Sequence, residues 1–145
     1  MKIEIDQSGK IEDTKKHTVI AISNEHSYSI VIKRGTKRLL FRKLKSAKAL
    51  KFKLFAICVY LTLKDFLDID LELISIDEEY EGHEKDIQSE LVNLIRKNHP
   101  SFDKKLIRFS RISKNSRAHI LAYSVLKGLK EADKELSEKE IMLLI

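Results

Sequence analysis

The stretch IEIDQSGKIED at residues 3–13 combines a short apolar strand with an aspartate and a glycine turn. Residues 3–5 alternate between apolar and charged side chains, as expected for a half-buried β-strand. Asp6 follows at the end of this pattern, and Gly9 then predicts a turn. A turn-starting aspartate has an ordinary explanation, because its side chain often bonds the backbone two residues further on. The rest of the chain favours a second explanation, in which Asp6 is a functional residue.

The composition is that of an ordinary globular protein. The 145 residues are 43% apolar and 34% charged, so we expect a single domain over residues 1–145 with a sizeable core. The longest apolar run, residues 54–63, is too short to cross a bilayer, and no membrane partner is expected. The only cysteine, Cys58, excludes an internal disulfide and favours a reducing, cytoplasmic location.

Charge is distributed unevenly along the chain. The formal net charge is +6, and ten of the 21 residues from Lys33 to Lys53 are Lys or Arg, with no acid among them. Eleven of the 22 acids lie between Asp65 and Glu90. Two interpretations are open: a solvated helix face with a solvated loop, or a basic surface for a polyanion beside an acidic cluster that holds cations.

Hydrophobic periodicity predicts an antiparallel meander followed by alternating helices and strands. Strands are expected at residues 2–6, 17–23, 28–33, 71–76 and 106–112, and residues 38–42 are expected to extend the meander. Helices are expected at residues 46–67 with Ser46 as the cap, at 84–97, at 116–128 and in a short segment after Ser137. The predicted fold class is therefore mixed α/β, with a central mixed sheet of about five strands that starts with a three-stranded antiparallel meander and is flanked by helices.

Two of the predicted strands end on an aspartate, at Asp6 and Asp77. Functional groups gather beyond strand ends, and if these two strands are neighbours their aspartates lie a few ångströms apart. Bare carboxylates at that distance repel each other, and Mg²⁺ or Mn²⁺ would remove the penalty. An exposed acidic loop is the alternative for residues 77–84. Further candidate ligands follow at once, with Glu78 first, then Glu79, Glu81 and Glu84.

The segment KNSRAHILAY at residues 114–123 predicts a helix that carries His119 beside an apolar face. This helix begins directly after a strand, near the same sheet edge as the two aspartates. A histidine at the margin of an apolar face is commonly a packing residue, and the alternative is a ligand or proton-transfer group. Lys114 and Arg117, in the loop and the first turn, are placed to contact a phosphate.

In the order and placement of these residues the chain resembles the ribonuclease H-like superfamily, especially its Holliday-junction-resolvase branch. The resemblance covers residues 2–128, from the strand ending in Asp6, through the strand ending in Asp77, to the late helix with His119. It implies two Mg²⁺ or Mn²⁺ ions that activate water for in-line attack on a phosphodiester. Asp6 would bridge the metals, Asp77 would be the second ligand, and His119 would be a late ligand or proton-transfer group.

One feature departs from ribonuclease H itself, which supplies a glutamate from its first helix. Residues 46–64 contain no acid, which favours the resolvase-like branch and leaves open a degenerate site. The expected function is a metal-dependent nuclease acting on DNA or RNA. The alternatives are a catalytically silent nucleic-acid-binding module of the same fold and, less specifically, an interaction protein or another enzyme.

The expected partner is a nucleic acid, whether DNA, RNA or a hybrid, and a two-fold substrate would favour a homodimer. The basic segment and the loop before the late helix supply the expected contacts. The expected nucleic-acid-binding residues are Lys37, Arg38, Arg42, Lys43, Lys45, Lys48, Lys114 and Arg117.

Overall fold

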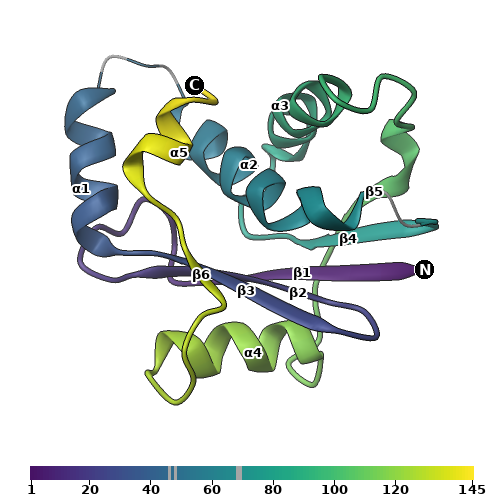
Figure 1. The fold of residues 1–145 in the computed structure, drawn as a ribbon, viewed down its shortest axis with the longest axis horizontal. Coiled ribbons are helices and arrows are strands. Elements are labelled where there is room, and N and C mark those ends of the chain that lie inside the picture. The colour runs from purple at the N-terminus through teal and green to yellow at the C-terminus, as the bar shows by residue number, and fades with distance from the viewer. Residues whose placement is uncertain (46, 48, 68–69) are drawn as a thin grey trace.

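The structure is a computed structural model that describes residues 1–45, 47, 49–67 and 70–145. A six-stranded mixed sheet runs through it in the order β5-β4-β1-β2-β3-β6 (Figure 1). The strands are β1 (Lys2–Ser8), β2 (Thr18–Ser23), β3 (Ser27–Ile32), β4 (Leu73–Asp77), β5 (Ile107–Ser110) and β6 (Lys134–Glu135). The helices are α1 (Arg34–Lys43), α2 (Leu50–Leu63), α3 (Glu84–Arg96), α4 (Arg117–Leu126) and α5 (Glu138–Met142), with 3₁₀ turns η1 (Lys64–Phe66) and η2 (Lys104–Leu106). The predicted mixed α/β fold class is confirmed, with one strand more than the five expected.

The first three strands form the predicted antiparallel meander. Ile5 of β1 lies opposite Ile22 of β2, while on its other side β1 pairs in parallel with β4. The turn after β1 depends on Gly9, whose φ is +79° and whose missing Cβ would overlap the carbonyl oxygen of His17. A meander with parallel β4 and β5 beside its first strand is compatible with the ribonuclease H-like topology.

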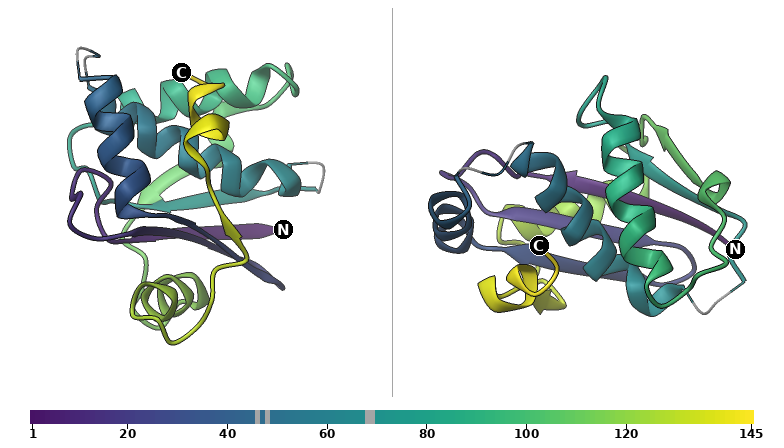
Figure 2. Two further views of the ribbon diagram at one scale, coloured as in Figure 1. Left: turned by 60° about the vertical axis from the view of Figure 1, so that its left-hand side comes forward. Right: turned by 90° about the horizontal axis from the view of Figure 1, so that it is seen from above.

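Helices cover both faces of the sheet unequally. Helix α4 lies alone on one face, and the other four helices lie on the opposite face (Figure 2). Ala118 and Ala122 of α4 are fully buried, and Ala122 packs in one cluster with Val19 and Ala21 of β2, so the small side chains let this helix lie close to the sheet. Helix α2 is enclosed by the sheet and α3, and twelve of its fourteen residues are buried. Within the described part of the chain, no helix is both long and apolar enough to span a membrane.

Two predicted elements differ from the structure. Residues 38–42 do not extend the sheet but belong to α1, because Lys37 and Leu40 recur at helical spacing on its buried side. The helix predicted over 46–67 is shorter: it begins at Leu50, ends at Leu63 and continues only as the η1 turn. The proposed cap Ser46 and the basic residue Lys48 lie outside the described residues.

Candidate metal centre

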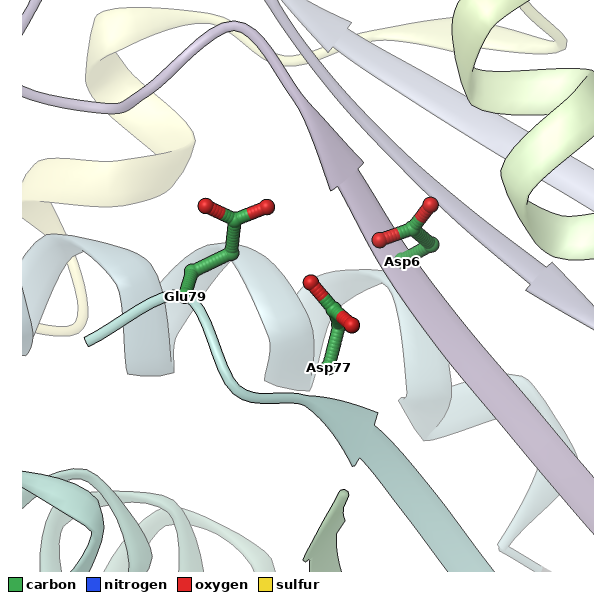
Figure 3. A group of neighbouring side chains, drawn as sticks. All are labelled: Asp6, Asp77 and Glu79. Carbon is green, nitrogen blue, oxygen red and sulfur yellow. The ribbon is translucent and has the colours of Figure 1, made fainter. Parts of the chain in front are cut away.

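Three carboxylates meet where β1 and β4 run side by side. The parallel register pairs Ile5 with Ile76, which brings Asp6 and Asp77 to the same place along the two strands. Asp6, Asp77 and Glu79 each place one carboxylate oxygen within 4.8 Å of the others (Figure 3). The expectation that Asp6 and Asp77 lie close together is confirmed. The first strand is longer than expected, because it does not end at Asp6 but continues to Ser8.

Asp6 is nearly buried, with 3% of its surface exposed, because α4 covers this part of β1. Its carboxylate Oδ2 lies 2.7 Å from Nδ1 of His119 on α4. Burial is the main cause that raises the pKa of Asp6, and the negative charge of Asp77 adds to it. The hydrogen bond from His119 acts in the opposite direction and favours the carboxylate.

Asp77, the last residue of β4, is hydrogen-bonded to the segment between β5 and α4. Its Oδ1 accepts a hydrogen bond of 2.8 Å from the backbone N–H of Ile112. One oxygen is therefore fixed by the loop after β5. The helix that carries His119 was expected to lie near the two aspartates. This bond and the contact between His119 and Asp6 show that it does.

Glu79 completes the group from the loop after β4. Its pKa is raised to about 7, first by burial and then by a hydrogen bond and charge repulsion from Asp77 and Asp6. Burial and the two neighbouring carboxylates therefore favour the protonated form of Glu79 over its charged form.

Glu78 was expected as the next ligand, but Glu79 is the glutamate that lies beside the two aspartates. The Glu78 side chain is exposed, while its backbone N–H donates to the carbonyl oxygen of Ser110 at 3.2 Å. This bond extends the pairing of β4 with β5 and turns Glu78 outward and Glu79 inward. The aromatic Tyr80, which is buried and holds the loop to the core, is the feature of the sequence that favours Glu79 over Glu78.

A cavity of about 500 Å³ opens over the three carboxylates. Its wall contains His119 and two basic side chains, Arg111 and Lys114. The expected position of Lys114 near the site agrees with this lining, and Arg111 was not anticipated. Arg117 lies instead on a neighbouring hollow of about 1030 Å³ along the same sheet face, which also includes Glu4 and Arg108.

The first half of the basic segment lies on and just after α1, and its basic side chains are exposed with one exception. Arg38, Arg42, Lys43 and Lys45 are exposed, as expected for contacts to a polyanion. Lys37, expected among them, is fully buried, so it is not part of that surface. Its Nζ donates to the carbonyl oxygens of Lys10 and Asp13, at 3.2 and 2.6 Å, and to Thr18 Oγ1 at 2.9 Å.

The function is inferred from the site geometry and the sheet topology. Comparison with known proteins identified no family, no curated protein and no solved structure that matches this chain.

Proposed function

We propose that this protein is a metal-dependent nuclease that hydrolyses phosphodiester bonds of DNA or RNA. The observation that carries the proposal is the group formed by buried Asp6 on β1 and the partly buried Asp77 and Glu79 at and after the end of the parallel strand β4. A sheet compatible with the ribonuclease H-like topology places that group beneath an open cavity.

The donor set fits Mg²⁺ or Mn²⁺. All three groups offer carboxylate oxygens, which are the ligands that these cations prefer. Burial and then the charges of Asp77 and Asp6 raise the pKa of Glu79, and a divalent cation at this place would stabilise all three carboxylates. Bound in this place as a pair, the cations would neutralise the phosphodiester and supply the nucleophilic water.

His119 has two roles in the proposed mechanism. Its Nδ1–H donates to Asp6 and holds that carboxylate in one orientation. The other ring nitrogen, Nε2, is left to exchange a proton with water or substrate, because His119 lines the cavity. Arg111 and Lys114 on the same wall orient the anionic phosphate.

The nucleic acid would extend from the cavity over the basic surface of α1. A catalytically silent nucleic-acid-binding module is the second candidate. It is favoured by the lack of an acidic side chain on α2, since residues 50–63 contain none. The buried free thiol of Cys58 is in keeping with a cytoplasmic location for either candidate.

The test compares neighbouring carboxylates on one panel of single-stranded and duplex DNA, RNA, RNA–DNA hybrid and four-way junction. We expect cleavage with Mg²⁺ or Mn²⁺ that is lost in excess EDTA. Asp6→Asn and Glu79→Gln should reduce the rate by at least about 100-fold, because each removes a ligand charge. The matched control is Glu78→Gln, which alters an exposed carboxylate in the same loop and should retain the rate.

Each outcome separates the candidates. The metal mechanism would be contradicted if Asp6→Asn, or the wild type in excess EDTA, cleaved as fast as the wild type with Mg²⁺ or Mn²⁺. Salt-sensitive binding by the wild type without cleavage of any substrate would favour the silent module over the nuclease. A loss of rate in Glu78→Gln equal to that in Glu79→Gln would contradict the assignment of the third carboxylate.

A further inference from the structure

Tyr80 follows Glu79 directly and points into the protein. Only 7% of its surface is exposed. Its ring packs edge-on against two phenylalanines of α2, with centroid distances of 5.6 Å to Phe52 and 5.2 Å to Phe55. The aromatic contacts hold the loop after β4 against the core, but they do not face β1 or the loop that follows it.

The hydroxyl group of Tyr80 makes the connection to the loop after β1. It accepts a hydrogen bond of 3.3 Å from the backbone N–H of Ile11, which is buried. Its single O–H has two acceptors in reach, Oε1 of Glu12 at 3.1 Å and Oε1 of Gln7 at 3.4 Å. All three partners lie within six residues of Asp6 along the chain. One hydroxyl therefore joins the segment that carries Asp6 to the segment that carries Glu79.

We propose that the Tyr80 hydroxyl is a positioning group that sets the separation of Glu79 from Asp6 and so tunes the cation site. This inference rests on the proposed function, because it requires that the carboxylates bind a cation. Without the hydroxyl, the Ile11 N–H has no acceptor in its buried place, and the two loops are free to move apart. The aromatic packing of the ring stays, so the fold is retained.

The separation of the ligands matters more for some cations than for others. Mg²⁺ requires near-octahedral oxygen ligands at about 2.0–2.1 Å, whereas Ca²⁺ accepts flexible geometry at about 2.3–2.6 Å. Loosening the link between the two loops should therefore weaken Mg²⁺ binding more than Ca²⁺ binding. A residue that only stabilises the fold would not change the ratio of the two affinities.

The experiment measures Mg²⁺ and Ca²⁺ affinities by calorimetric titration of wild type and Tyr80→Phe. We expect Mg²⁺ affinity to fall by about 10- to 100-fold, the usual effect of removing a partner that orients a ligand, and Ca²⁺ affinity to fall by less. The matched control is Tyr123→Phe, since Tyr123 lies on α4 with 49% of its surface exposed. It should leave both affinities unchanged.

A second pair of variants tests the same link from the other side. Glu12→Ala removes the nearer of the two acceptors of the Tyr80 O–H and should lower Mg²⁺ affinity in the same direction, whereas Glu12→Gln keeps an acceptor oxygen and should retain the affinity. Unchanged Mg²⁺ affinity in Tyr80→Phe, or an equal loss for Mg²⁺ and Ca²⁺, would overturn the positioning role. Wild-type protein that binds neither cation would instead overturn the proposed function.

Discussion

Burial and charge conflict at the Glu79 carboxyl. Its folded-state pKa of about 7 lies above the ordinary value of 4.5 that the unfolded chain would show. Between these two pH values the folded protein binds more protons than the unfolded protein. The stability that this group contributes is therefore fully present below pH 4.5 and is lost as the pH rises towards 7.

Glu79→Gln should remove this loss. In metal-free buffer at pH 8, we expect the variant to be more stable than the wild type by on the order of 1–3 kcal/mol, since solvent screens a half-buried group. At pH 4 the two proteins should have similar stability. Urea unfolding across this range, with EDTA present, measures the difference. Glu78→Gln is the control and should follow the wild type; an identical pH dependence in Glu79→Gln would contradict the raised pKa.

Some site residues were predictable from the sequence because their backbone positions were. Asp77 ends β4, and Asp6 lies within β1 two residues before its end, so the strand backbone and not a loop fixes the position of each carboxylate. The choice between Glu78 and Glu79 depends on a backbone hydrogen bond to Ser110, a residue far along the chain. Lys37 was mispredicted for a similar reason. The carbonyl groups that satisfy its ammonium come from another loop, and burial lowers its pKa to about 8.

At the scale of elements, α1 shows why a basic run need not be a uniform surface. Lys33 and Lys43 pair with Glu135 and Glu138 of the C-terminal segment. Three exposed arginines remain, and their guanidinium groups form no hydrogen bond or ion pair in the described part of the chain. These are Arg34, Arg38 and Arg42, at intervals of four residues. Each step of four residues rises about 6 Å along a helix, so the three form one stripe.

We expect this stripe to contact the phosphates of a bound nucleic acid. Replacing all three arginines by glutamine should weaken binding and reduce the slope of log K against log salt by roughly 2–3, because each contact to duplex DNA contributes about 0.9. Glutamine is compatible with the helix, so folding should be retained. Fluorescence anisotropy titrations at several salt concentrations measure the slope.

The control for the stripe removes the same charge elsewhere. Lys97, Lys104 and Lys105 are exposed in the connection between α3 and β5, which lies across the molecule from α1 (Figure 1). Their replacement by glutamine should change the slope by less than one unit. An equal reduction in both triple variants would show that net charge, and not α1, determines binding.

At the scale of the whole molecule, a mixed sheet that starts with an antiparallel meander was predictable from the sequence, and the sixth strand was not. Alternating patterns and turn residues determine the meander, and the parallel strands follow from the helices between them. β6 has two exposed residues without an apolar pattern. Its place beside β3 depends on Asp133, whose carboxylate accepts from the backbone N–H of Ser29 at 2.8 Å. Such a contact across 104 residues leaves no local signal in the sequence.

Cation binding should stabilise the whole fold, because the ligands come from two different strands and a loop that are brought together only in the folded state. A cation present at 100 times its dissociation constant adds about 2.7 kcal/mol to the free energy of unfolding. For a chain of this length, that corresponds to a rise in Tm of roughly 5–10 °C. Differential scanning calorimetry with increasing Mg²⁺ at pH 8 measures this rise.

The same titration at pH 5 should give a smaller rise. Glu79 holds a proton at that pH, since its pKa is about 7, and Mg²⁺ must displace the proton before it can bind. Asp77→Asn serves as the control, because the asparagine keeps an oxygen that can accept from Ile112 N–H but removes a ligand charge. Its Tm should not respond to Mg²⁺ at either pH. A response in Asp77→Asn equal to that of the wild type would place the stabilising cation away from the three carboxylates.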